Sequence, residues 1–245
     1  MAAGLRLQTA FAGVAARVLS GRVLIGPTAL VFSRQLYYTG VQSAGVVVLA
    51  AALIGFGFVY SFQSVLSLSG SRALELLAVL AVRSLGVLIT GFVFSARSIT
   101  AISAEMTLLQ VTGERTTLER LGIDTRLYLV LPRVLASVLG VAILNLYFVT
   151  TTLLAATVAL SGRIDVLAVE RVISGIDPAL VFAGVIRAGV FAGISVLWVL
   201  RFAVRGRRTF PEVPVAASVA VLQSIVLMLL LETAYQLLTF QPGTP

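Results

Sequence analysis

Residues 134–161, VLASVLGVAILNLYFVTTTLLAATVALS, contain no charged side chain. As an α-helix this stretch would be about 42 Å long, whereas the hydrocarbon core of a bilayer is about 30 Å thick. A membrane-spanning β-strand needs only about 10 residues, and its side chains alternate between apolar and polar. The segment therefore predicts a transmembrane helix.

The rest of the chain has the same character. Of its 245 residues 59% are hydrophobic and 11% are charged, and its mean hydropathy is +1.05, whereas a soluble domain averages about 25% charged residues. We expect one domain, 1–245, that is an all-α integral membrane protein. The five predicted spans are residues 41–68, 76–104, 134–161, 179–200 and 213–238. The first is long enough that we expect it to be tilted, or broken near Gly55 and Gly57.

The N-terminal region, residues 1–34, has an amphipathic pattern instead of a purely apolar one. Leu7, Phe11, Val14 and Val18 fall on one stripe of a helix, and arginines flank it. This pattern predicts a helix that lies in the membrane interface and leads into the first span. An ordinary packing helix is the alternative.

Arginine placement predicts the orientation of the chain. All 18 basic residues are arginine. Twelve of the 18 lie in three segments, which are the N-terminal region and the loops 105–133 and 201–212. In a chain with five spans these three segments fall on the same side of the membrane. Cytoplasmic flanks are enriched in basic residues, so we expect the N-terminus inside and the C-terminus outside. The arginines punctuate apolar runs and are not pooled with aromatic residues, so nucleic-acid binding is not expected.

Several chemistries are excluded by residues that the chain lacks. It has no cysteine, histidine or lysine. Disulfides, Cys/His metal sites, thiol nucleophiles, histidine triads and a phosphate-binding P-loop lysine are therefore absent. We predict no catalytic residue and no metal site. An intramembrane lipid-modifying enzyme would have to rely on carboxylates alone, and Glu105 and Glu232 are isolated in the sequence.

Charged residues inside the spans are candidate functional residues, because burying a charge in a bilayer costs at least about 2.5 kcal/mol. On a helical wheel Arg83, Arg97 and Glu105 share one face of the second span. That face could contact an anionic headgroup or a moving helix, or it could form an internal ion pair with its ends snorkelling to the interfaces. Arg187, in the fourth span, has no charged neighbour at helical spacing, so snorkelling or a carbonyl contact is expected there.

The loop 111–124, VTGERTTLERLGID, lies on the arginine-rich side. Leu118 and Leu121 form a short apolar edge, opposite a charged edge of four residues: Glu114, Arg115, Glu119 and Arg120. The pattern predicts a short amphipathic helix that a motor subunit could grip. A solvated interfacial turn is the alternative.

Several of these motifs together resemble the MlaE/YrbE permease family, the membrane subunits of lipid transporters that work with MCE-domain proteins. The resemblance runs from about residue 21 to 241, and no single motif decides it; order and spacing carry it. The motifs are RQLYYTG at 34–40, RSLG at 83–86, AR at 96–97, AE at 104–105, VT…D at 111–124 and LPR at 131–133.

The resemblance implies a role and a set of partners. It implies a phospholipid permease in a bacterial inner membrane, built as a homodimer or as a heterodimer with a paralogue around a lipid pocket. It implies a cytoplasmic ABC ATPase that holds the ATP and Mg²⁺, a periplasmic MCE-domain protein and a STAS-domain regulator. In the family pattern Arg83, Arg97 and Glu105 match polar positions of the second span. Glu119 and Asp124 match acids of the ATPase-coupling helix.

The chain also departs from the family pattern. Ser84 and Val87 stand where the family has glutamate and proline. Gly113 stands where an acid is usual, with Glu114 one place later, and Thr125 replaces a proline. A passive scaffold that anchors an MCE protein without transport is therefore a rival interpretation.

Overall fold

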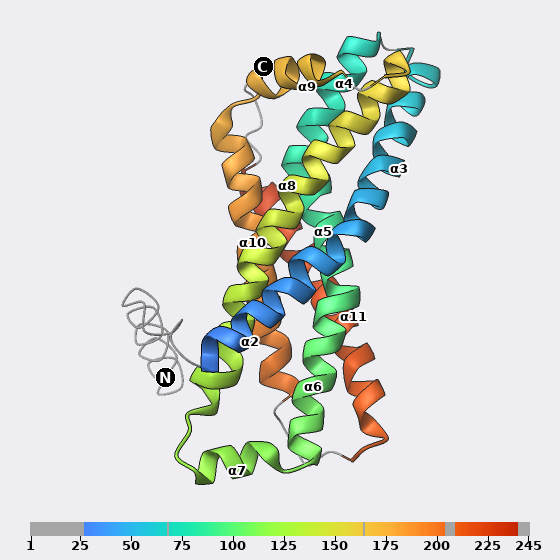
Figure 1. Cartoon of the computed structure of the whole chain (residues 1–245). Helices are drawn as coiled ribbons and strands as arrows, with labels where there is room; N and C mark the ends of the chain where they lie inside the picture. Colours follow the sequence, from blue (N-terminus) through green and yellow to red (C-terminus); the bar gives the residue numbers. More distant parts are fainter. Residues whose placement is uncertain (1–26, 68, 164, 204–208, 240–245) are drawn as a thin grey trace.

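The computed structural model describes residues 27–67, 69–163, 165–203 and 209–239. Within these ranges every regular element is helical, and five helices are long and apolar enough to cross a membrane, as predicted. They run between two ends of an elongated bundle, with α7 at one end and α9 at the other (Figure 1). The amphipathic stripe predicted from Leu7 to Val18 lies outside the described residues.

The first spanning helix begins well before residue 41, where we expected it. Its described part starts in the region assigned to the interfacial helix and continues into the apolar segment through a π-helical turn. Its three parts are α2 (Pro27–Leu36), η2 (Tyr37–Val41) and α3 (Gln42–Ser64).

The predicted break near Gly55 and Gly57 is wrong, because α3 runs through both glycines as a regular helix. Gly55 instead faces α8. A Cβ at Gly55 would lie 2.4 Å from the carbonyl oxygen of Thr152, whereas a Cβ at Gly57 would meet nothing within 4 Å. Gly55 therefore permits close contact between two helix backbones.

The second spanning helix runs from residue 70 to 111 and is longer than the predicted 76–104. Two π-helical turns interrupt its α-helical pattern, and each contains an arginine, Arg83 or Arg97. A π turn changes the angular register of all the residues that follow it. The five segments are α4 (Gly70–Leu80), η3 (Ala81–Leu85), α5 (Gly86–Phe94), η4 (Ser95–Ile99) and α6 (Thr100–Val111).

The loop after α6 contains the predicted short helix, α7 (Glu114–Arg120), which crosses the end of the bundle (Figure 1). Gly113 precedes it with φ +74° and Gly122 follows it with φ +77°. Glycine adopts this left-handed conformation at little cost, so the chain turns sharply on both sides of α7. The chain then continues through η5 (Arg126–Val130) into α8 (Leu131–Ser161), the third span.

The remaining helices complete the bundle. The short α9 (Val166–Ser174) begins at Asp165, whose side chain accepts a hydrogen bond from the Ala168 amide at 3.0 Å. The fourth and fifth spans follow as α10 (Pro178–Ala203) and α11 (Glu212–Thr239). Their ends lie close to those expected.

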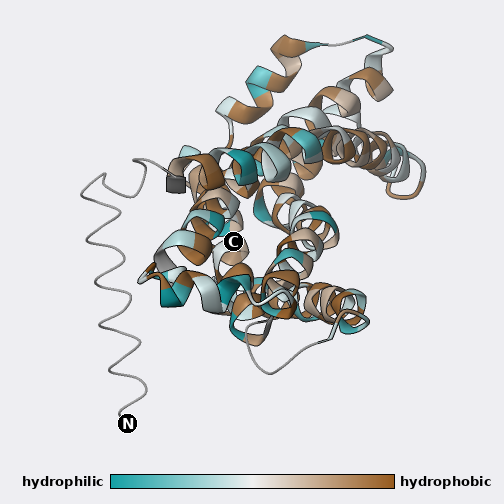
Figure 2. Ribbon diagram, turned by 60° about the horizontal axis from the view of Figure 1, so that its bottom comes forward, coloured by the Kyte–Doolittle hydropathy of each residue, from teal (hydrophilic) through white to brown (hydrophobic). Residues whose placement is uncertain are grey.

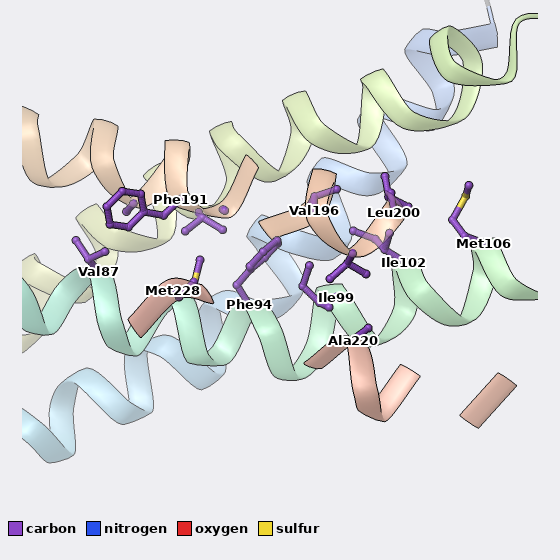
Figure 3. Close-up of a cluster of buried hydrophobic side chains, with 14 of the residues drawn as sticks. Val87, Phe94, Ile99, Ile102, Met106, Phe191, Val196, Leu200, Ala220 and Met228 are labelled. Atoms are coloured by element: carbon purple, nitrogen blue, oxygen red, sulfur yellow. The ribbon is translucent and has the colours of Figure 1, made fainter. Parts of the chain in front are cut away.

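The apolar interior has α8 at its centre, with α2, α3 and α10 packed against it. One hydrophobic cluster joins α3, α4 and α8, and a second joins the middle of the second span to α10 and α11. Figure 3 shows the second cluster, where Phe94 and Ile102 pack near Val196, Ala220 and Met228. These clusters fix the positions of the polar side chains described below.

The outer surface is also apolar. Large side chains such as Leu53, Tyr60, Phe182 and Leu222 are each more than 60% exposed. Hydrophobic colours occur all around the bundle when it is seen toward the α7 end (Figure 2). Exposed apolar surface on this scale is unusual for a soluble monomer and is expected where a protein meets lipid or a partner.

Candidate functional site

An ion pair lies buried between the fourth and fifth spans. The Arg187 Nε and the Glu232 Oε2 are 3.3 Å apart, and the two side chains are 6% and 4% exposed. These two atoms are not aligned for a hydrogen bond, so their attraction is mainly electrostatic. The expectation that Arg187 snorkels or contacts only a carbonyl is therefore incomplete, because a carboxylate from another helix pairs with it.

Further groups surround this pair. The Arg187 guanidinium lies over the Tyr235 ring, 4.1 Å from the ring centroid, and its Nη2 donates to the carbonyl of Arg83. The Gln236 Nε2 donates to the Glu232 Oε1 at 2.9 Å and to the Ser84 Oγ at 2.7 Å. One connected polar cluster thus joins η3, α10 and α11.

The cluster satisfies groups that a bilayer would leave without partners. An unpaired charge or an unsatisfied carbonyl at membrane depth is costly. The π turn at 81–85 departs from the regular α-helical ladder, and the Arg83 carbonyl accepts bonds from two side chains of other helices. The Arg83 side chain itself is exposed and lies on the outside of this cluster.

A second ion pair lies toward the α7 end. The Arg133 Nη2 is 2.7 Å from the Glu105 Oε1, and the Arg133 side chain is 3% exposed, against 53% for Glu105. The Arg133 Nη1 also donates to the Leu129 carbonyl at 2.6 Å. This arginine therefore ties the end of α6 to the start of α8, on the two sides of the loop that carries α7.

A cavity of about 860 Å³ opens beside this pair. Arg97 and Glu105 both line it, whereas Arg83 does not. The Nη1 of Arg97 donates to the backbone carbonyl of Gln42. The structure thus brings together two of the three residues predicted to share a face, whereas Arg83 lies about 21 Å farther along the second span and does not reach the cavity.

The charged edge of α7 divides into bonded and exposed residues. The Glu119 Oε1 accepts bonds from the Arg115 Nε at 3.0 Å and from the Thr125 Oγ1 at 3.2 Å. Glu119 therefore holds the loop together. Glu114 and Arg120 are exposed, as is Asp124 farther along the loop. Of these, Arg120 presents a charge on the outer end of the bundle without an ion pair to a described carboxylate.

A further cavity, of about 770 Å³, lies at the opposite end of the bundle beside α9. Glu75, Asp165 and Arg171 are among its lining residues. The two ends of the bundle also differ in charge, since more of the described arginines lie near the α7 end than near the α9 end. Those nearest the α7 end are Arg34, Arg115, Arg120, Arg133 and Arg201.

Sequence reasoning missed the pairing of Arg187 with Glu232 and that of Glu105 with Arg133. In each pair the partners come from different helices, so no helical spacing links them. One usable signal was present in the sequence. Arg187 and Glu232 are lone charges of opposite sign within two consecutive spans, and lone charges inside a membrane are expected to find partners.

Fold and site together define a multi-pass helical membrane protein with ion pairs inside its bundle and a short helix between two spans at one end. The family described as Permease MlaE matches residues 32–238, most of the described helices. The chain belongs to the MlaE permease family, which confirms the resemblance inferred from its motifs.

Two curated relatives are similar to the chain. Protein TRIGALACTOSYLDIACYLGLYCEROL 1, chloroplastic, from Arabidopsis thaliana is 29% identical over 197 residues, which cover 78% of this chain and 55% of the relative. The intermembrane phospholipid transport system permease protein MlaE from Haemophilus influenzae is 27% identical over 118 residues, which cover 47% of this chain and 45% of the relative. The chain thus spans about half the length of the curated relatives it matches.

Proposed function

We propose that this chain is the transmembrane permease subunit of an ATP-driven phospholipid transporter that moves lipid between the inner and outer membranes of a bacterial cell. Family membership over residues 32–238 is the observation that carries the proposal. The printed name of the Haemophilus influenzae relative, an intermembrane phospholipid transport system permease, supports the choice of substrate. The chain itself works without a cofactor, and ATP and Mg²⁺ belong to a partner ATPase.

The α7 end is the proposed ATPase side. This end carries the arginine-rich segments, which favours a cytoplasmic location under the positive-inside rule. The short α7 lies across the end of the bundle, and its loop is braced by the contacts of Glu119 and by the Glu105–Arg133 pair. The loop joins α7 to α6 and α8, and the Glu105–Arg133 pair ties these two spans to each other, so a push on α7 would reach both. The coupling residues are Glu114, Arg115, Glu119, Arg120 and Asp124, and among them Arg120 offers an exposed positive charge.

The remaining partners are proposed from membership of the family. The α9 end would face the periplasm and an MCE-domain protein, and a STAS-domain regulator would bind on the ATPase side. Two copies of the chain, or this chain and a paralogue, would enclose the lipid pocket. The exposed apolar faces of the bundle offer surface for both lipid and a second permease.

The experiment is co-purification of the chain with its ATPase, followed by measurement of ATP turnover with and without added phospholipid. We expect stoichiometric ATPase and lipid-stimulated turnover. Arg120→Glu is expected to weaken ATPase association while insertion is retained, because the side chain is exposed. Arg72→Glu, at the opposite end, is the matched control and should change nothing.

The outcomes separate the rival interpretations. An ATPase that binds Arg120→Glu as well as it binds the wild-type chain would remove α7 as the coupling site. A complex that assembles without lipid-stimulated turnover would favour the passive scaffold. Conversion of a lipid by the chain alone would favour an intramembrane enzyme, although Glu105 and Glu232 each face an arginine.

A further inference from the structure

The cavity at the α7 end combines a cationic lining with an apolar one. It lies among the first spanning helix, the end of the second, α7 and the start of the third. Its volume of about 860 Å³ is in the range of small-molecule sites. Arg34 and Arg97 supply guanidinium groups from two different helices. Leu30, Leu109 and Leu129 supply apolar walls.

The charges of this lining do not cancel. Arg133 is neutralised by Glu105 at 2.7 Å. Arg34 and Arg97 form no ion pair with a carboxylate of the described residues. Glu114 is the remaining carboxylate of the lining and is exposed at the start of α7. Besides the Glu105–Arg133 pair, the lining therefore carries two arginines and one carboxylate, and the cavity favours an anion.

Both arginines are held in place. The guanidinium carbon of Arg34 lies 5.7 Å from the centroid of the Tyr38 ring, and Tyr38 also lines the cavity. Arg97 is anchored through one nitrogen to the Gln42 carbonyl, and none of the other described residues is bonded to its remaining N–H groups. Planar guanidinium groups match the oxygens of a phosphate, and anchored ones lose less entropy when they bind it.

We propose that this cavity binds the phosphate headgroup of a glycerophospholipid, with Arg34 and Arg97 contacting the phosphate and the first acyl carbons lying against Leu30 and Leu109. The apolar walls favour a lipid over free phosphate, because inorganic phosphate has no group to place against them. The proposal rests on the proposed lipid-transport function for the class of occupant. The site would be a second lipid site beside α7, distinct from the pocket between two permease copies.

The position of the cavity would link a bound lipid to α7. Glu114, Thr117 and Leu118 of α7 belong to its lining, so an occupant would touch the helix proposed to contact the ATPase. A bound lipid would thereby join α2, α6 and α7 through one ligand. Lipid occupancy and ATPase contact would be coupled through α7.

The test uses the full chain reconstituted in vesicles that contain a photoactivatable phosphatidylglycerol, with its diazirine near the start of the acyl chain. Diacylglycerol with the same chains and the same diazirine is the matched probe without phosphate. After illumination, labelled peptides are mapped by mass spectrometry. We expect phosphatidylglycerol to label the peptides around Leu30 and Leu109 about tenfold more than diacylglycerol, since a charge-assisted bond contributes about that factor.

Variants assign the labelling to the arginines. Arg34→Gln with Arg97→Gln should lower the labelling by phosphatidylglycerol about tenfold or more, whereas Arg72→Gln, at the other end of the bundle, should leave it unchanged. Arg34→Gln alone tests the site if the double variant fails to insert, because Arg34 is exposed. Inorganic phosphate at millimolar concentration should not compete.

Equal labelling by the two probes, or wild-type labelling in the arginine variants, would overturn the site. Competition by inorganic phosphate would overturn the lipid as its occupant. These outcomes are distinguishable from failure of the proposed function. A chain that supports ATP-driven lipid transport but is not labelled here loses only this site, and a chain that is labelled here but never transports lipid loses only the proposed function.

Discussion

Removing the carboxylate of Glu232 is the perturbation for which the structure gives the clearest expectation. In a Glu232→Leu variant the Arg187 guanidinium would remain buried, with the Tyr235 ring and the Arg83 carbonyl as its remaining partners among the described residues. Breaking a buried ion pair from one side costs about 3–5 kcal/mol. Because those two partners remain, we expect a loss near the lower end, about 3 kcal/mol. That is roughly a 150-fold change in the unfolding equilibrium.

Removing both charges should cost much less than the two single losses together. We expect Arg187→Met to lose about 3 kcal/mol, since it leaves Glu232 buried with Gln236 as its remaining donor. The double variant should lie within about 2 kcal/mol of the wild-type chain, because similar apolar volume replaces the pair. The coupling energy would then be at least about 4 kcal/mol. Neutral hydrogen bonds between membrane helices average only about 0.6 kcal/mol. The measured coupling energy therefore distinguishes a buried ion pair from a neutral hydrogen bond.

The assay is reversible unfolding in mixed micelles with increasing SDS. The chain has a single tryptophan, Trp198 on α10, so its fluorescence reports directly on a helix of the pair. Equal protein amounts and the same detergent ratios are used for all four members of the cycle. Single variants that lose less than about 1 kcal/mol, or a double variant that loses the sum of the two, would refute the reasoning.

Three other predictions concern packing, surface exposure and topology. Gly55→Val should lower the midpoint of unfolding by SDS, with a loss of about 1–3 kcal/mol of stability from steric overlap with α8. Gly57→Val is the control and should cost less than about 1 kcal/mol. Equal losses in the two variants would contradict the close contact between α3 and α8. Arg83→Ala should change the free energy of unfolding by less than about 0.5 kcal/mol, because its side chain is exposed; a loss like that of Glu232→Leu would place its side chain in the buried cluster. Reporter fusions at Gly122 and Gly162 should lie on opposite sides of the membrane, with Gly122 cytoplasmic, and a shared side would exclude the proposed orientation.

Much of the fold was predictable because its cause is local. Length and hydrophobicity alone determine whether a segment can span a bilayer. Residues 134–161 could therefore be predicted as a span without reference to any other part of the chain. The short helix α7 was predictable for a similar reason, since its charged and apolar edges repeat at helical spacing between two glycines. The start of the first span was less predictable, because α2 is helical although its sequence is less uniformly apolar.

The same distinction between local and tertiary causes applies to the charged residues of the sites. Sequence alone determined that Arg97, Glu105, Arg187 and Glu232 are charges in or beside membrane spans, where each needs a partner or water. Only the tertiary structure decided which partners they have. Helix packing brings Glu232 to Arg187, and the loop that holds α7 brings Arg133 to Glu105. The physical reason is that pairing depends on which helix faces meet and on the register within them, and two π turns alter that register in the second span.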